Sequence, residues 1–309
     1  MSRIAWIALS VAATALIVAV VSAAFVVGGT RTKSTAGVPV SRPGSEPPTL
    51  SLPLAKDRSA LMLAKHDRDL LVGIAARPAG PVEVAALRAE TPLPTAALAV
   101  RLDGRPVDAT QCGAGCSRVE GGVLSGSPAR LSVRVGQSEL AFELPARLPP
   151  SGSALFARVQ KTMGALRSWR YVERLSSGRG AVVSHIGAQA PNRLRIRSST
   201  GFRLVIIGRR RWIFQGGRWE RSSFPGLSVS ELFMWDGAAH ARILGPLRPG
   251  SRLTALAAFH AEPFPAWFRL AVDASGRVLE AEMIAPSHFM LHDYGDFNGA
   301  ISIRPPTGK

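Results

Sequence analysis

Pro191–Arg221 reads Pro-Asn-Arg-Leu-Arg-Ile-Arg-Ser-Ser-Thr-Gly-Phe-Arg-Leu-Val-Ile-Ile-Gly-Arg-Arg-Arg-Trp-Ile-Phe-Gln-Gly-Gly-Arg-Trp-Glu-Arg, a run of short segments separated by glycine. Near its start, Leu194 and Ile196 alternate with arginines. An alternation of period two places apolar side chains on one face of a strand and charged ones on the other. Gly201, Gly208 and Gly216 mark the turns, because glycine tolerates the positive φ of tight hairpins. The stretch predicts a curved antiparallel sheet with an apolar inner face.

The chain has 309 residues and a formal net charge of +17, almost entirely from arginine. Such a charge is compatible with nucleic acid or an anionic membrane surface as a partner. The basic residues are scattered singly along the predicted strands, and Arg209–Arg211 is the main cluster. No helix-turn-helix, zinc-finger or single-strand stacking motif accompanies them. We therefore interpret them as solvated strand faces near an anionic membrane surface, and expect no nucleic-acid partner.

Residues 4–29 carry no charge and are dominated by Ala, Val, Ile and Leu. At about 1.5 Å per residue, a helix of this length exceeds the roughly 30 Å hydrocarbon core of a bilayer. Residues 1–29 are therefore a transmembrane anchor or a long signal peptide, and the length of the apolar run favours the anchor. Residues 30–54 are rich in Gly, Ser, Thr and Pro, which is typical of a linker.

The two cysteines, Cys112 and Cys116, lie in Cys-Gly-Ala-Gly-Cys, and the rest of the chain has none. A disulfide pair suits an exported protein, which favours domains on the extracytoplasmic side of the cell membrane. The alternative, a two-thiolate metal site, lacks further ligands nearby. We favour the disulfide.

Residues 55–148 contain about seven short alternating segments separated by turns, which predicts an immunoglobulin-like β-sandwich. With its Cys-Gly-X-Gly-Cys turn, this part resembles the small extracytoplasmic β-domains attached to bacterial copper-transport membrane proteins. The segment lacks the His and Met clusters that copper binding needs, and Met62 and His66 are its only soft ligands. We therefore do not expect this domain to bind metal.

Residues 149–309 begin with a predicted helix over about 154–169, capped by Ser153, whose apolar face carries Leu155, Val159, Met163 and Leu166. Predicted strands follow, the last of them at 299–304. Two interruptions, 228–244 and 253–260, are expected to be helical or irregular.

This order resembles the LolA-like fold of periplasmic lipoprotein carriers and related mycobacterial lipid-carrying lipoproteins. The resemblance is carried by 155–173, by the hairpin at 202–219 and by the ending Met-Ile-Ala-Pro-Ser-His-Phe-Met-Leu-His-Asp-Tyr-Gly-Asp-Phe-Asn at 283–298. It implies a curved half-barrel whose concave side is closed by helices and holds acyl chains. The sandwich and the apolar N-terminus depart from the family pattern, and they favour a tethered binder over a shuttling carrier.

Apolar side chains gather in the middle of this half. They predict either a filled core or a ligand cavity, because a curved sheet of this length encloses more volume than its own side chains fill. We favour the cavity, and its candidate lining residues are Leu194, Ile196, Phe202, Leu204, Ile206, Trp212, Phe214, Trp219, Phe224, Phe233 and Trp235.

His288 and His292 are four residues apart and would share one face of a helix, a spacing that suits a metal. Pro286 and Gly295 leave little room for a helix, so a structural role is favoured over metal binding. No nucleophile elbow, phosphate loop or dinucleotide fingerprint is present. We expect neither an enzyme nor a cofactor.

The sequence thus predicts a mainly β, single-pass membrane protein that holds a lipid or a lipoprotein acyl chain in a half-barrel. One alternative is an envelope sensor or accessory subunit that binds a membrane-protein partner without a lipid. Another is extracytoplasmic copper handling.

Overall fold

The structure is a computed structural model that describes residues 59–178, 180–261 and 265–307. Within these ranges the chain is mainly β, with one α-helix, α2 (Ser153–Gly164), and two short 3-10 helices, η2 (Thr95–Ala97) and η3 (Val229–Glu231). None of the helices in the described ranges has the length and apolar character to span a bilayer. The predicted anchor at 1–29 and linker at 30–54 lie outside the described residues.

Two sheets form a sandwich between residues 61 and 144. One contains β1 (Leu61–Asp67), β2 (Leu70–Ala76), β3 (Val82–Arg88), β8 (Cys116–Val119) and β7 (Ala109–Gly113) in this order, with β4 (Thr91–Pro92) beside β3. The other has the order β10 (Ser138–Leu144), β9 (Ala129–Val135), β5 (Ala99–Leu102), β6 (Arg105–Val107).

The sandwich differs in connectivity from the predicted immunoglobulin-like one. Its first three strands are consecutive neighbours in one sheet, whereas an immunoglobulin domain moves to the other sheet after its second strand. The core between the sheets includes Leu70, Val72 and Ile74 from β2, and Leu131 and Phe142 from the opposite sheet. The alternation predicted a sandwich correctly, but the period of a strand does not specify which strand is its neighbour.

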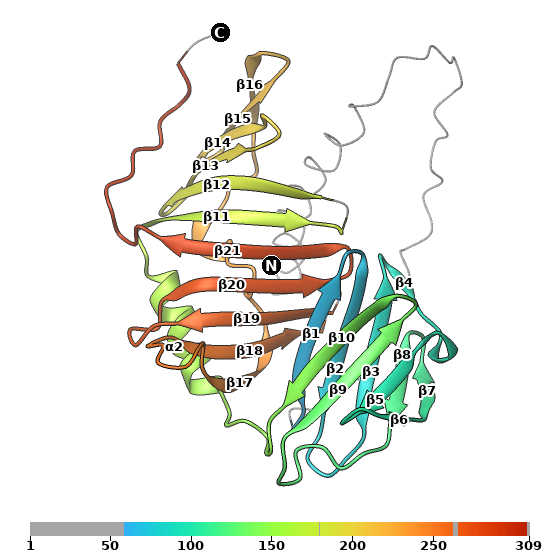
Figure 1. The fold of residues 1–309 in the computed structure, drawn as a ribbon. Helices are drawn as coiled ribbons and strands as arrows, with labels where there is room; N and C mark the ends of the chain where they lie inside the picture. The colour runs from blue at the N-terminus through green and yellow to red at the C-terminus, as the bar shows by residue number, and fades with distance from the viewer. Residues whose placement is uncertain (1–58, 179, 262–264, 308–309) are drawn as a thin grey trace, which may run out of the picture.

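A single sheet of eleven antiparallel strands makes up the C-terminal half. In spatial order it contains β16 (Arg218–Ser223), β15 (Arg210–Gln215), β14 (Arg203–Ile207), β13 (Arg193–Ser198), β12 (Ala181–Gln189), β11 (Ser168–Ser176), β21 (His288–Gly295), β20 (Val278–Ala285), β19 (Ala266–Val272), β18 (Thr254–His260) and β17 (Ala239–Pro246). Figure 1 shows these strands as one ladder, with α2 beside its β17–β19 end.

Three predictions for this half were wrong. Residues 254–260 and most of 239–246 are strands, where helical or irregular structure was expected. Residues 288–295 form a strand, and the predicted last strand at 299–304 is irregular. β18 lacks the polar alternation of a half-exposed strand, because both of its faces are buried.

Helix α2 is shorter than predicted, since the chain is already in β11 at Ser168. Its N-cap residue is Gly152 rather than Ser153, and the backbone N–H of Gly152 donates to the carbonyl oxygen of Ala241 at 2.8 Å. The buried side of α2 carries Phe156, Val159 and Met163. Phe156 thus takes the buried position that Leu155 was expected to occupy.

The sandwich packs on the outer face of the large sheet. Strand β2 is buried along its whole length: alternate residues enter the sandwich core, and the others contact the large sheet. The second contact brings Met62 and Leu71 together with Phe259, Trp267 and Phe289. The sheet β1-β2-β3 is therefore the middle layer of three.

Candidate functional site: the inner face of the large sheet

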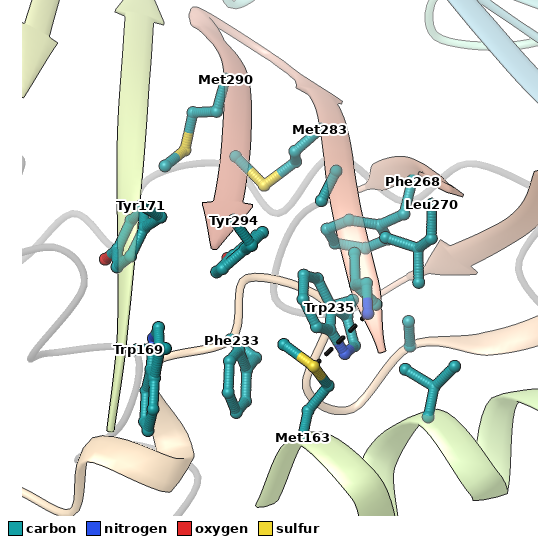
Figure 2. Packing of buried hydrophobic residues seen from close by; sticks show 14 of the residues in the cluster. Met163, Trp169, Tyr171, Phe233, Trp235, Phe268, Leu270, Met283, Met290 and Tyr294 are labelled. Atoms are coloured by element: carbon teal, nitrogen blue, oxygen red, sulfur yellow. Dashed lines mark hydrogen bonds between the residues drawn. The ribbon is translucent and has the colours of Figure 1, made fainter. Parts of the chain in front are cut away.

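The inner face of the large sheet is the face turned away from the sandwich. Cross-strand register places Leu194 opposite Ile206 and Ile196 opposite Leu204, all on this face. They belong to one buried cluster with Met163 of α2, which accepts a 3.4 Å hydrogen bond at its sulfur from the backbone N–H of Val278. Figure 2 draws this contact as a dashed line. The cluster extends across the sheet and is the core of the C-terminal half.

Two parts of the chain cover the inner face: α2 and the largely irregular residues 224–238, hereafter the covering segment. The covering segment inserts Phe233 and Trp235, whose rings lie 5.2 Å apart. Trp169 stacks on Phe233 at 5.0 Å, and Tyr294 contacts both residues of the segment. Figure 2 shows Trp169, Phe233, Trp235 and Tyr294 gathered beside α2. Beside Trp169 of β11 and Tyr294 of β21 the inner face is thus filled by protein.

The predicted cavity residues separate into three groups. Leu194, Ile196, Leu204, Ile206, Phe233 and Trp235 are buried in the inner cluster. Phe202 and Phe224 are partly buried against it. The prediction is wrong for Trp212, Phe214 and Trp219, which lie on the opposite face.

The register of β14 with β15 explains the error. Ile213 lies opposite Leu204 on the inner face, whereas Trp212 lies opposite Val205 on the outer face. Phe214 and Trp219 pair with each other across the β15–β16 hairpin and therefore share the outer face with Trp212. A shift of one residue reverses every side chain of a strand, and aromatic character alone does not fix that register.

The inner face changes character towards β13–β16. Apolar side chains in contact with the buried cluster stay partly exposed there, and they come from both the strands and the covering segment: Phe202, Ile213, Phe224, Leu227, Leu232 and Met234. The covering segment is joined to the strands in this region by backbone hydrogen bonds from Phe224 to Arg209 and from Val229 to Pro191. This end of the inner face is therefore accessible, and its apolar side chains lie beside the charged Arg211, Arg218 and Glu220 of β15 and β16.

A polar group interrupts the apolar inner face in the middle of the sheet. Glu173 on β11 lies opposite His292 on β21, and the Nε2 of His292 is 2.9 Å from a carboxylate oxygen of Glu173. The Nδ1 of His292 is 2.8 Å from the hydroxyl of Tyr294. An ionised carboxylate only accepts hydrogen bonds, so Nε2–H donates to Glu173. In the neutral imidazole Nδ1 then accepts from the hydroxyl of Tyr294.

Tyr171 borders the same group. Burial, and secondarily the negative charge of Glu173, raises the pKa of Tyr171 well above its usual value. Burial likewise raises the pKa of Tyr294, with smaller contributions from Tyr171 and Glu173. Both phenols are therefore protonated donors at neutral pH. The sequence contained a signal for this group, since Tyr171 and Glu173, like Met290, His292 and Tyr294, follow the period of a strand.

The predicted metal pair is not assembled. His288 and His292 lie on a strand, where four residues span about 13 Å. Both ring nitrogens of His292 are already hydrogen-bonded, and Nδ1 of His288 is 3.0 Å from the carbonyl oxygen of Pro286. Within the described ranges, no group of three or more His, Cys, Asp or Glu side chains is placed to hold a metal. The predicted disulfide between Cys112 and Cys116 is confirmed.

The outer face of β13–β16 is rich in arginine. Register places Arg197, Arg203 and Phe214 in one row, and Arg195, Val205 and Trp212 in the next. No carboxylate within the described ranges pairs with the arginines of this face, which are Arg193, Arg195, Arg197, Arg203, Arg210 and Arg221. Partial burial, followed by the charges of Arg197 and Arg170, lowers the pKa of Arg195. The Arg209–Arg211 cluster is divided, with Arg211 on the inner face over Phe224.

Comparison with known proteins gives limited matches. No model of a known protein family matches the chain, and neither does any curated protein. Among solved structures, the Mycobacterium tuberculosis lipoprotein LppX is 16% identical with a TM-score of 0.37, and the alignment covers 50% of this chain and 100% of LppX. LprF from Mycobacterium bovis is 10% identical with a TM-score of 0.35, covering 52% of this chain and 100% of LprF.

Proposed function

We propose that the C-terminal half holds an acyl chain of a lipid or lipoprotein against the inner face of β13–β16. One observation carries the proposal: partly exposed apolar side chains gather on that face and on the covering segment over it, including Phe202, Ile213 and Leu232. Single exposed apolar residues are ordinary, but a gathered apolar surface on a concave sheet suits an apolar ligand.

The binding would be driven by the removal of methylene groups from water, at about 0.8 kcal/mol for each one buried. Because the covering segment lacks a regular helix apart from η3, it can shift without breaking a strand ladder. In this proposal the protein is a binder rather than an enzyme, tethered to the cell membrane by residues 1–29 with its β-domains on the extracytoplasmic side.

The test is site-specific photo-crosslinking of the full chain. A fatty-acyl probe carrying a diazirine near its chain end is added to the chain in nanodiscs, and modified peptides are mapped by mass spectrometry. Labelling of 202–214 and 224–238 is expected. Ile213→Arg should reduce it at least tenfold, because a charged side chain then replaces an apolar one that packs against the buried cluster, whereas Ile207→Arg, on the outer face, should leave it unchanged. Equal labelling of both variants would sink the proposal.

The outer face of β13–β16 supports a second candidate role, contact with an anionic membrane surface. It combines arginines that form no ion pair with any described carboxylate with Trp212, Phe214 and Trp219. Arginine binds phosphate oxygens through two parallel hydrogen bonds, and aromatic rings favour the headgroup region. Each arginine near such a surface contributes about 1 kcal/mol.

Hydrogen exchange tests this role in the full chain. The β15–β16 hairpin should be better protected in phosphatidylglycerol nanodiscs than in phosphatidylcholine ones. High salt or Arg195→Gln/Arg197→Gln/Arg203→Gln should remove the difference. Protection that is independent of lipid charge would argue against membrane contact.

The sequence left two alternative functions open: a sensor or accessory subunit, and copper handling. A sensor or accessory subunit that binds a membrane-protein partner becomes the better account if no lipid labels the inner face. Copper handling is disfavoured, because the two cysteines form a disulfide and both nitrogens of His292 are occupied.

A further inference from the structure

Polar side chains form a row across the middle of the inner face. Ser184 on β12 lies opposite Glu173 on β11, and Glu173 lies opposite His292 on β21. The row is flanked by apolar positions on both sides: Tyr171 and Tyr294 two residues away in one direction, and Leu175 and Met290 in the other. A charged group in such surroundings is costly unless its hydrogen-bonding capacity is used.

The three side chains of the row differ in how many of their hydrogen-bonding atoms have a partner. His292 is saturated, since one ring nitrogen contacts Tyr294 and the other contacts Glu173. Glu173 uses one carboxylate oxygen, and no further donor within the described ranges reaches the other. The hydroxyl of Ser184 likewise makes no hydrogen bond to another described residue, although only 4% of Ser184 is exposed.

The side chains of His292 and Glu173 also differ in their exposure to solvent. The His292 side chain is 2% exposed, but that of Glu173 is 14% exposed although it projects from the middle of the same face. The Glu173 side chain therefore keeps some access to solvent, while the hydrogen bond to the buried imidazole holds its carboxylate in position. A held carboxylate with one free oxygen is an acceptor for a ligand donor group.

We propose that Glu173, held by His292 and assisted by Ser184, binds a hydroxyl group of the lipid whose chain lies along the inner face. This site rests on the proposed lipid-binding function and adds to it a preference for lipids that carry a hydroxyl group. A hydroxyl donates to the free oxygen of Glu173 and accepts from Ser184. A fatty-acid carboxylate is disfavoured there, because its charge has the same sign as that of Glu173.

The experiment compares two ligands that differ only in whether they carry a hydroxyl group that can donate a hydrogen bond. Oleyl alcohol and oleyl methyl ether compete with the diazirine probe on the full chain in nanodiscs, and the concentration of each that halves the labelling of the inner-face peptides is measured. We expect the alcohol to compete about tenfold better, the size of one hydrogen bond to a charged group. In Glu173→Gln this ratio should fall to about one, with the ether unchanged.

Glu282→Gln is the matched control, because it removes the same charge from the outer face of the sheet. It should keep the tenfold ratio. Ser184→Ala is a second variant of the site and should reduce the ratio severalfold; it keeps the test decisive if Glu173→Gln does not fold.

Other outcomes would overturn the inference in distinguishable ways. Equal competition by alcohol and ether in the wild type would remove the hydroxyl site and leave lipid binding standing. An equal loss for both ligands in Glu173→Gln would show that Glu173 only supports the fold. If neither ligand competes and the probe does not label the inner face, lipid binding itself fails and this site fails with it.

Discussion

The two halves of the outer face of the large sheet differ sharply. Towards β18–β21 this face carries Phe259, Trp267, Ile284 and Phe289, all buried against the sandwich. Towards β13–β16 it carries arginines and partly exposed aromatic residues, and the sandwich does not extend over it in Figure 1. The same sheet thus has a dry apolar contact at one end and a charged surface at the other.

The alternation of a strand specifies only which residues share a face, and the kind of residue at the outward positions decides what that face contacts. Trp267 lies over Gly73 so closely that a Cβ at position 73 would overlap its ring. His66 stacks on Phe289 with ring centroids 3.9 Å apart. Close fit of this kind joins two domains, whereas an unpaired arginine row leaves its face to solvent or to an anionic partner.

The largest loss of stability is expected at the apolar contact between the sandwich and the large sheet. Trp267→Ala should lower the free energy of unfolding by about 3–5 kcal/mol, because it leaves a cavity between the sandwich and the sheet. Trp212→Ala on the uncovered half should cost about 1 kcal/mol or less. Urea unfolding followed by circular dichroism measures both, and similar losses would contradict the proposed contrast.

A smaller loss of stability is expected from the contact between Gly73 and Trp267. Gly73→Ala should destabilise the protein by about 1–3 kcal/mol, because the added methyl group meets the Trp267 ring. In the Trp267→Ala background the same substitution should cost little, since that ring is gone. The double-mutant cycle measures this coupling, and additive losses would show that the two residues do not press on each other.

The smallest effect on stability is expected from the arginines on the outer face of β13–β16. Arg195→Gln, Arg197→Gln and Arg203→Gln should each change the free energy of unfolding by no more than about 0.5 kcal/mol, because no described carboxylate pairs with these arginines. Removing Arg197 should also relieve its repulsion of Arg195, which lowers the pKa of Arg195 in the wild type. A loss above about 2 kcal/mol in the same urea experiment would mean that these arginines hold the fold.

The sequence predicted the strand content, the two-layer sandwich and the disulfide, because each is a local pattern or a pair of residues close in the chain. It also predicted the inner position of Leu194 and Ile196, whose alternation is unbroken. It failed where both faces of a strand are buried, as in β18, and the pattern of a half-exposed strand is lost.

Pairings between distant strands were also beyond the sequence. Glu173 and His292 are 119 residues apart, and only the neighbouring position of β11 and β21 brings them together. The inward assignment of Trp212, Phe214 and Trp219 failed for a related reason, because the register of β15 depends on its hairpin with β14 rather than on its own composition.

Native mass spectrometry of the full chain released from nanodiscs, with organic extraction of anything bound, tests lipid binding most directly. The account predicts a complex heavier than the chain that loses one lipid on activation, with that lipid recovered in the extract and its amount greatly reduced in Ile213→Arg. A mass equal to that of the chain alone, with no lipid retained after incubation with phospholipid or oleyl alcohol, would contradict it.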